Sequence, residues 1–306
     1  MNFTVTILGS GSALPSANRF PSAQLVSLHH RHYLVDCGEG AQLQLCRYGL
    51  PMQKVSHIFI SHLHADHVLG IFGLISTMSM LGREAPLHIY APPGMQPILA
   101  GHLRYFGDGV SYGIEVHELR GDRKEVVLEE EHFTVASFPL QHRTPTCGFL
   151  FREKTPPRNI YKEAIEKYRL PVSAILEVKR GGDLTLPGGE VVPNEKLTYQ
   201  PYAPRTYAYC SDTVACDDVA REICGVTLLY HEATFADNMR DFAVARGHTT
   251  ALQAAQIARD ANAKKLVIGH FSSRYKSAEA LVAEARAVFA NTFAAEDGKT
   301  FPVEAD

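Results

Sequence analysis

The sequence has few cysteines, no long apolar run and no strong excess of either charge. Its six cysteines include no Cys-x-x-Cys pair and are too sparse in 306 residues to form a disulfide scaffold. We therefore expect reduced, mostly buried thiols in a cytosolic protein. Lys and Arg number 30 and Asp and Glu number 33, for a formal net charge of −3. This balance provides no electrostatic signature of nucleic-acid binding, so any such partner has to be inferred from motifs.

The sequence also lacks signals for membrane insertion or export. The longest nearly uncharged run, Val68 to Gly82, is shorter than the roughly 20 residues of a membrane-spanning helix. The start MNFTVTILGS has no basic segment of the kind that begins a secretory leader. We expect a cytoplasmic protein with no membrane contact. Because 45% of its residues are hydrophobic, the chain can form one large α/β domain or two modest ones.

Strand-like and helix-like segments alternate along the chain on both sides of one segment with a different amino-acid composition. The predicted strands before that segment are Phe3–Leu8, Ala23–Leu28, His32–Asp36, Val55–Ile60 and Leu87–Tyr90, followed by a strand-rich region from Ile114 to Phe151. The predicted helices there are Glu39–Tyr48, Val68–Met80 and Met95–Tyr105. After the segment we expect strands at Thr206–Cys210, Val226–Tyr230 and Leu266–Gly269, and helices at Cys216–Cys224, Thr250–Asn262 and Ala278–Phe289.

The segment that interrupts this alternation, residues 152–200, is rich in proline and glycine. We interpret it as an insertion that forms a projecting arm. The whole chain, residues 1–306, is then a single domain in which two sheets pack face to face with helices outside. The arm carries nine basic and seven acidic residues, a weak preference for a polyanion.

Fifteen histidines make up an unusually large set of potential metal ligands, and four ligand-type residues form one string. Directly after the strand Val55–Ile60, the chain reads His62-Leu63-His64-Ala65-Asp66-His67. In an extended segment His62 and His64 point the same way, while Asp66 and His67, at the turn into a helix, can face a second point nearby. This layout predicts two metal ions, each with an open coordination position. The alternative is a hydrogen-bonded polar loop with Asp66 as the helix cap.

Three further candidate ligands follow predicted strands. His142, Asp212 and His270 each lie at a strand-to-loop junction, where sites in α/β proteins are usually built. A carboxylate such as that of Asp212 has two oxygens and can bridge two cations. With the His62–His67 string, these residues complete a ligand set for two metals.

Further motifs narrow the chemistry. They are Leu8-Gly9-Ser10-Gly11-Ser12-Ala13-Leu14-Pro15, Asp36-Cys37-Gly38-Glu39-Gly40, His231-Glu232-Ala233-Thr234, His248-Thr249-Thr250 and Gly269-His270-Phe271-Ser272-Ser273-Arg274-Tyr275. Together with the histidine string, they make essentially the whole chain resemble the ribonuclease Z (tRNase Z) family, short form, of the metallo-β-lactamase superfamily. The resemblance implies a four-layer αβ/βα fold. It also implies one zinc ion on His62, His64, His142 and Asp212, and a second on Asp66, His67, Asp212 and His270.

The same resemblance implies a function. The family members are endoribonucleases that remove the 3′ trailer from precursor tRNA, leaving a 3′-hydroxyl on the tRNA and a 5′-phosphate on the trailer. By this likeness a hydroxide between two zinc ions, with Mn²⁺ as a possible replacement, attacks the phosphorus, and Asp66 orients it and accepts its proton. His248, assisted by Glu232, helps the 3′ oxygen leave. Lys179 and Arg180 in the arm are the candidate substrate-binding residues, in a homodimer whose arm holds tRNA for the partner's active site.

Some residues depart from the family pattern, and two other functions stay open. His248-Thr249-Thr250 replaces the usual His-Ser-Thr, Phe20 replaces an amide, and the arm tip around Leu170 to Ala174 is poor in glycine. For His231, support of the metal ligands and direct catalysis are equally open readings. One alternative function is a small-molecule metallo-hydrolase of the same fold, acting on a thioester, a lactone or a cyclic phosphodiester. The other is a non-catalytic RNA-binding relative, which would not need the intact ligand set.

Overall fold

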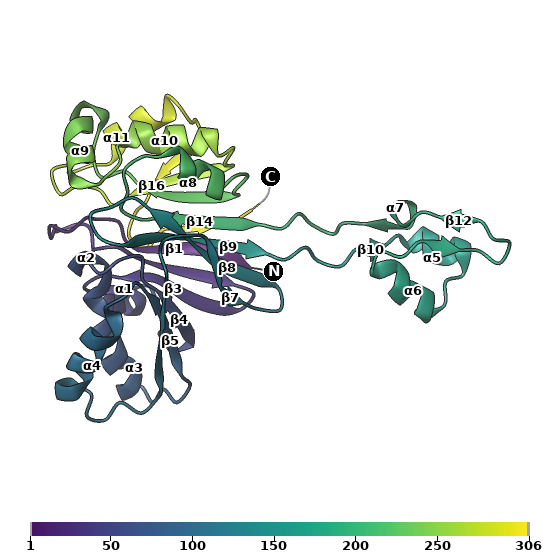
Figure 1. Cartoon of the computed structure of the whole chain (residues 1–306), viewed down its shortest axis with the longest axis horizontal. Helices are drawn as coiled ribbons and strands as arrows, with labels where there is room; N and C mark the ends of the chain where they lie inside the picture. The colour runs from purple at the N-terminus through teal and green to yellow at the C-terminus, as the bar shows by residue number, and fades with distance from the viewer. Residues whose placement is uncertain (1, 305–306) are drawn as a thin grey trace. The chain divides into compact units, whose positions relative to one another are not determined.

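The structure, a computed structural model, describes residues 2–304 and consists of two compact units. Unit 1 contains the chain up to Glu129, the segment Thr134–Arg152 and the chain from Arg205 onward. Unit 2 contains Glu130–Phe133 and Glu153–Pro204. Figure 1 draws both units. The chain therefore leaves unit 1 twice, first at residues 130–133 and then at residues 153–204, which form most of unit 2.

Two seven-stranded sheets form the centre of unit 1. The first has the order β18-β1-β2-β3-β4-β5-β6, with the bounds β1 (Phe3–Gly9), β2 (Ala23–Leu28), β3 (Arg31–Cys37), β4 (Val55–Phe59), β5 (Leu87–Ala91), β6 (Ile114–Glu118) and β18 (Thr300–Pro302). The second has the order β17-β16-β15-β14-β9-β8-β7, with the bounds β7 (Glu125–Glu129), β8 (Phe133–Leu140), β9 (Thr146–Glu153), β14 (Thr206–Cys210), β15 (Leu228–Glu232), β16 (Lys265–Gly269) and β17 (Thr292–Ala294).

Aromatic side chains fill the space between the two sheets. Phe59 of β4 lies with its ring centroid 5.4 Å from that of Phe149 and 5.6 Å from that of Phe151, both on β9. All three rings are fully buried. The hydroxyl of Tyr207 on β14 donates to the side chain of Gln24 on β2, so a polar contact also joins the sheets. Burial of such large rings is the main favourable contribution to joining two sheet faces.

Helices cover the outer face of each sheet, which completes four layers (Figure 1). The first sheet packs on α1 (Ala41–Arg47), α3 (Gly70–Met80) and α4 (Met95–Phe106), near η1 (Met52–Lys54) and α2 (Ala65–Val68). The second packs on α8 (Asp217–Glu222), α10 (Ala251–Asp260) and α11 (Glu279–Arg286), near η2 (Asp237–Met239) and α9 (Arg240–Arg246). Each helix layer and its sheet enclose one apolar core. The predicted four-layer αβ/βα architecture is confirmed.

The local predictions agree with the structure except at a few places. The predicted hairpin is β2 and β3, which pair antiparallel. The helix predicted at Val68–Met80 is instead two helices, α2 and α3, which meet at Leu69. At Gly70, the first residue of α3, the chain approaches the Asp36–Gly40 loop so closely that a Cβ would lie 2.0 Å from the carbonyl oxygen of Gly38, which requires glycine at this position. The short elements α9, β17 and β18 were not predicted.

Unit 2 has a small core of its own. Its elements are β10 (Asn159–Ile160), α5 (Lys162–Tyr168), α6 (Val172–Lys179), β11 (Leu184–Thr185), β12 (Val191–Val192), α7 (Asn194–Leu197) and β13 (Thr198–Tyr199). Ala164, Val178, Val192 and Leu197 are buried together. The side-chain amide of Asn194 donates to the carbonyls of Val178 and Gly182, which ties the end of α6 to α7.

The cysteines and the helix lengths bear on two expectations from composition. All six cysteines are free thiols. Cys37, Cys147 and Cys210 are buried, but Cys46 and Cys224 are exposed, so the expectation of mostly buried thiols holds for only half of them. Within residues 2–304, the helices are all too short or too polar to cross a membrane.

Replacing Phe59 with Ala tests the contribution of the rings between the sheets. We expect the free energy of unfolding to fall by about 3–5 kcal/mol, because a buried phenyl ring is removed and a cavity remains. Urea denaturation followed by circular dichroism, at one fixed zinc concentration, measures the change. Leu43→Ala, at a position that is 60% exposed, is the control and should change stability little. Equal destabilisation by the two substitutions would contradict the role of Phe59.

Candidate metal centre

The predicted ligands converge within unit 1 because the loops that carry them leave strands of the two facing sheets. The segment from Ser61 to His67 follows β4, and His142 follows β8. Asp212 follows β14 and His270 follows β16, two strands of one parallel set. Ligand atoms of these residues form two groups, each with all atoms within 4.8 Å of one another: His62, His64, His142 and Asp212, and Asp66, His67 and His270.

In the first group, ring nitrogens face one another at close range. Nε2 of His62 lies 3.0 Å from Nδ1 of His64, which lies 3.3 Å from Nε2 of His142. Oδ2 of Asp212 lies 3.6 Å from Nε2 of His62 and 3.9 Å from Nε2 of His142. Ligand atoms that coordinate a single cation lie at similar distances from one another.

The second group lies on the other side of the same carboxylate. Nε2 of His270 lies 3.3 Å from Oδ2 of Asp66 and 3.4 Å from Nε2 of His67. Oδ1 of Asp212 lies 3.3 Å from Nε2 of His270 and 3.6 Å from Nε2 of His67. Oδ1 is buried and accepts no hydrogen bond within residues 2–304. Asp212 therefore presents one oxygen to each group, the placement that a bridging ligand needs.

Hydrogen bonds hold the outer nitrogens of the histidine rings. Nδ1 of His67 lies 2.7 Å from Oδ2 of Asp36, and Nδ1 of His142 lies 2.7 Å from the carbonyl oxygen of Gly247. The remaining two contacts join Nδ1 of His62 to Oγ of Ser61 at 3.0 Å and Nδ1 of His270 to Oγ1 of Thr234 at 2.8 Å. With Nδ1 engaged, each of these rings turns Nε2 toward the centre, as metal-ligating histidines do.

The electrostatics of the centre fit cations. Burial lowers the pKa of His67, but the negative charges of Asp212, Asp36 and Asp66 outweigh burial and raise it to about 10. The surroundings that favour a protonated ring also favour a metal ion at this point. Burial and the neighbouring rings hold the pKa of His62 well below its usual value, so that ring is a neutral donor. The donor set of nitrogen and carboxylate oxygen atoms, with the unpartnered Oδ1 of Asp212, fits two divalent ions.

Glu232 and His248 form a pair beside the second group. Oε1 of Glu232 lies 3.1 Å from Nδ1 of His248 and accepts from the backbone N–H of Thr249 at 2.7 Å. Its Oε2 accepts from the backbone N–H and the hydroxyl of Thr234. Burial lowers the pKa of His248, but the charge and hydrogen bond of Glu232 raise it to about 9. The carboxylate thus fixes the ring and favours its protonated form.

The structure also places the remaining predicted residues. His231 is fully buried on β15, where its Nδ1 lies 2.7 Å from the carbonyl oxygen of Glu232. It belongs to none of the ligand groups found among residues 2–304. Lys179 and Arg180 are exposed at the end of α6, in unit 2.

Two residues that hold the ligands are not among the predicted site residues. Asp36 was noted only as part of a motif, although it accepts hydrogen bonds beside His67. Gly247 was not considered, yet its φ of +76° and the 2.6 Å that would separate its Cβ from Nδ1 of His142 both require glycine. The Asp36-Cys37-Gly38 motif was a usable signal for Asp36. The sequence around Gly247 shows only a glycine before His248, which is no specific signal.

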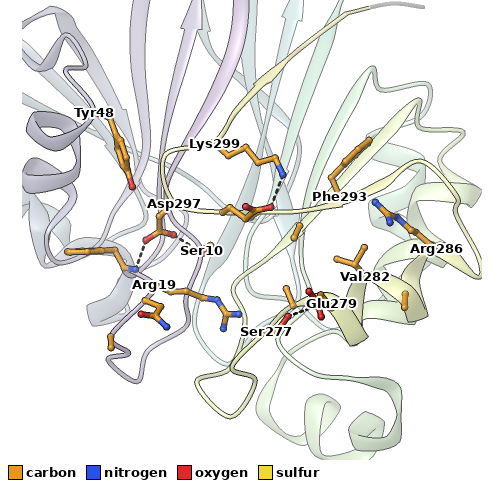
Figure 2. Close-up of a pocket in the computed structure, with 18 of the residues that line it drawn as sticks. Ser10, Arg19, Tyr48, Ser277, Glu279, Val282, Arg286, Phe293, Asp297 and Lys299 are labelled. Carbon is orange, nitrogen blue, oxygen red and sulfur yellow. Dashed lines mark hydrogen bonds and ion pairs between the residues drawn. The ribbon is translucent and has the colours of Figure 1, made fainter.

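A separate cavity of about 920 Å³ lies in unit 1 between the loop after β1, α11 and the chain before β18. Figure 2 shows the side chains that line it. Asp297 accepts from the hydroxyl of Ser10 at 2.7 Å and from the backbone N–H of Phe20 at 2.8 Å, which closes one wall. None of the predicted ligands or catalytic residues lines this cavity. It is therefore distinct from the metal centre.

Asp36→Asn tests the support of the ligands. The amide cannot reproduce the carboxylate that accepts from Ser61, Tyr209 and the ring of His67, so we expect zinc affinity at the centre to fall about 10–100-fold. Competition with a chromogenic chelator measures the affinity. Glu39→Gln, an exposed carboxylate three residues away, is the control and should bind zinc as the parent does. Unchanged affinity in Asp36→Asn would remove Asp36 from this role.

Comparisons with known proteins extend over the whole chain. A "Ribonuclease Z" from Bacteroides fragilis is 46% identical over 295 residues, which cover 96% of this chain and 97% of that protein. The crystal structure of human tRNase Z, short form, aligns with a TM-score of 0.72 and 27% identity over 99% of this chain and 100% of that chain.

Two further matches concern the fold and the first half of the chain. The metallo-beta-lactamase fold protein YhfI from Bacillus subtilis aligns with a TM-score of 0.69 and 21% identity over 99% of this chain, a likeness of fold. Residues 3–155, half of the chain, match the family described as Anti-Pycsar protein Apyc1. Because a curated relative is 46% identical over nearly its full length, the chain belongs to the ribonuclease Z family, and it has the metallo-β-lactamase fold.

Proposed function

We propose that this protein, an endoribonuclease of tRNA 3′ processing, removes the 3′ trailer of precursor tRNA with two zinc ions held by the seven residues of the metal centre. One observation carries the metal count: Asp212 presents Oδ2 to His62 and Oδ1 to His270, so one carboxylate serves two groups of ligands. His62, His64 and His142 hold the first ion, and Asp66, His67 and His270 hold the second. Mn²⁺ can take the same oxygen and nitrogen donors.

When bound, the two ions lower the pKa of a water molecule toward about 7 and neutralise negative charge that develops on the phosphate oxygens. Asp66 orients the attacking water and accepts its proton. Its Oδ2 lies 3.3 Å from His270 and 3.5 Å from His67, and its side chain is 9% exposed. This carboxylate is therefore fixed by two rings and still open to the solvent side, where a substrate phosphate arrives.

His248 protonates the departing 3′ oxygen of the tRNA. Its side chain is 14% exposed, whereas that of Glu232 is 1% exposed. The histidine is thus the member of the pair that substrate can reach, and Glu232 holds its ring and stabilises its positive charge. This assignment leaves a hydroxyl on the tRNA and a phosphate on the 5′ end of the trailer. His231, which is fully buried, supports the centre and does not touch substrate.

Unit 2 is the tRNA-binding arm of a single domain, inserted at about residues 152–200. Lys179 and Arg180 are both exposed where α6 ends, so their charges are available to phosphates. Val178, directly before them, is buried in the core of unit 2. The backbone that presents the two cations is therefore held in place, as a phosphate-binding element requires.

The enzyme is a cytoplasmic homodimer. Exposed apolar side chains gather where α3 and α4 end: Met80, Leu81, Tyr105 and Phe106 are 60–79% exposed. Met80 and Phe106 line one hollow of about 310 Å³. Apolar patches of this kind mark protein interfaces, and the occupant we propose is the same patch of a second copy.

Asp66→Ala tests the proposed chemistry. On a precursor tRNA, the zinc-loaded parent should release a trailer with a 5′-phosphate and a tRNA with a 3′-hydroxyl, as end mapping of the products will show. The variant should lose at least about 10²–10⁴-fold in kcat because the group that accepts the proton, which is also one ligand of the second ion, is gone. Its Kd for the same tRNA should stay within about threefold of the parent's value, since this one carboxylate contributes little to holding the tRNA. A variant with the parent's kcat would contradict the role of Asp66. A parent enzyme that cleaves small diesters or esters but not precursor tRNA would favour the small-molecule hydrolase.

Lys179→Ala/Arg180→Ala tests the arm without deleting Val178 from its core. We expect the Kd for precursor tRNA to rise about tenfold and the salt dependence of log Kd to flatten by roughly 0.7–0.9 for each phosphate that the arm no longer neutralises. Hydrolysis of a small chromogenic phosphodiester should continue at the parent's rate. The charge-matched control Arg259→Ala/Lys264→Ala removes one exposed arginine and one exposed lysine from unit 1 and should leave tRNA binding unchanged. Equal tRNA affinity in the parent and the arm variant would exclude these two cations from recognition.

Leu81→Lys/Phe106→Lys tests the dimer. Charge in an apolar interface is strongly unfavourable, so sedimentation velocity should show the parent at twice 33.8 kDa and the variant at 33.8 kDa. Val126→Lys, at another exposed apolar position on β7, is the control and should leave the mass unchanged. A monomeric parent, or a dimeric double variant, would contradict the proposed interface.

A further inference from the structure

Three ligand-type side chains gather on β5 and β6, on strands that carry none of the active-site ligands. His88 lies on β5, and Glu115 and His117 lie on β6, the edge strand of the first sheet. The strands are parallel, with His88 opposite Glu115 and Tyr90 opposite His117. Because side chains alternate along a strand, Glu115 and His117 project from the same face of the sheet.

The ligand atoms of these residues form a compact triangle. Nδ1 of His88 lies 3.2 Å from Nε2 of His117 and 3.3 Å from Oε2 of Glu115. The third side, between Nε2 of His117 and Oε2 of Glu115, is 3.9 Å. Ligands about 2.0–2.1 Å from a tetrahedral zinc ion are roughly 3.3–3.4 Å apart, so the triangle needs only a small adjustment of Glu115 to surround one ion.

Stacked rings hold both histidines in place. The ring of His88 stacks on that of His57 on β4, with centroids 4.8 Å apart and an interplanar angle of 20°. The ring of His117 stacks on that of Tyr90, at 4.5 Å and 17°. His57 and Tyr90 are each only 8% exposed, so the rings behind the triangle are themselves fixed. Ligands that are ordered in advance lose less conformational entropy when a cation binds.

The triangle is also open to a cation from solution. The side chains of His88, Glu115 and His117 are 26%, 57% and 39% exposed. Three protein ligands with one position left for water are a common coordination of zinc, and imidazole nitrogen with carboxylate oxygen suits zinc and its neighbours in the first transition series. The structure contains the ligand type, the spacing and the access that such a site needs.

We propose that His88, Glu115 and His117 form a zinc-binding site that is additional to the active centre. A zinc ion here links β5 to β6. Among residues 2–304, β6 pairs in the first sheet only with β5, and an edge strand opens more readily than a central one. The bound ion therefore stabilises the pairing of β6 with β5. The stability of this sheet edge then depends on a cation that takes no part in catalysis. This inference does not depend on the proposed function of the active centre.

Zinc stoichiometry tests the site. Equilibrium dialysis of untagged protein against buffered Zn²⁺, with elemental analysis, should show one more equivalent in the parent than in His88→Ala/His117→Ala. The readout is this difference, which holds whatever number of ions the active centre binds. The control His102→Ala/His132→Ala removes two other histidines and should bind as many equivalents as the parent. The His88→Ala/His117→Ala variant should cleave precursor tRNA at the parent's rate, which shows that the active centre is intact.

A conservative variant and a local readout complete the experiment. Glu115→Gln keeps the shape of the side chain but removes its charge, so it should weaken binding of the extra ion at least about tenfold. This variant decides the case if the double variant does not fold.

Hydrogen exchange of the amides in residues 114–118 gives a local readout. When the free zinc concentration is 100 times the dissociation constant of the site, exchange should slow about 100-fold in the parent and not in the variants. Peptides from α10 serve as the internal control. Equal stoichiometry in the parent and the folded variants, or zinc-independent exchange of β6, would overturn the proposal and leave a stacked, hydrogen-bonded histidine pair.

Discussion

The buried carboxylate of Asp36 is the group on which the metal centre depends. It lies at the end of β3 in the first sheet and accepts from the hydroxyl of Tyr209 on β14 in the second sheet, at 2.6 Å. The same carboxylate accepts hydrogen bonds from the backbone N–H and the hydroxyl of Ser61, where the loop that carries His62 to His67 begins. It also lies beside Nδ1 of His67. One side chain therefore joins both sheets, the loop and a ligand. An unpaired buried carboxylate is very unfavourable, so the loss of any one of these partners destabilises the rest of the network.

The network also explains why a centre with so many titratable groups is compatible with a stable fold. Asp36, Asp66 and Asp212 bring three carboxylates close to the fully buried ring of His67. Such a concentration of negative charge destabilises a compact chain unless positive charge is placed within it. A proton on the His67 ring is favoured there for this reason, and a divalent cation that takes the place of that proton supplies more positive charge. The folding energy and the affinity for a divalent cation are therefore coupled at this cluster, because the negative charge that favours a cation is unfavourable without one.

The sequence predicted the parts of this arrangement that are local. The His62–His67 string lies in six consecutive residues, and the strand before it and the helix after it follow from apolar periodicity. The four-layer architecture followed from the resemblance together with alternating strands and helices. The contacts that support the ligands from a distance were not predicted: the carbonyl of Gly247 holds the ring of His142, 105 positions away, and a Cβ at Gly70 would lie 2.0 Å from the carbonyl oxygen of Gly38. The triangle on β5 and β6 was also missed, because it depends on the register of two strands, which periodicity alone does not determine.

Backbone conformation distinguishes the two clusters of ligands in unit 1. Around the active centre, Asp36 and His270 have φ values of +55° and +59°, a left-handed region that non-glycine residues seldom occupy, and Gly247 has +76°. Each such non-glycine position costs about 1–3 kcal/mol, which the surrounding sheets offset. On β5 and β6, by contrast, regular strand geometry alone brings His88, Glu115 and His117 together. The active centre therefore requires strained loops because its ligands come from four separate segments and must converge on two points. A cluster on neighbouring strands requires only the right residues in register.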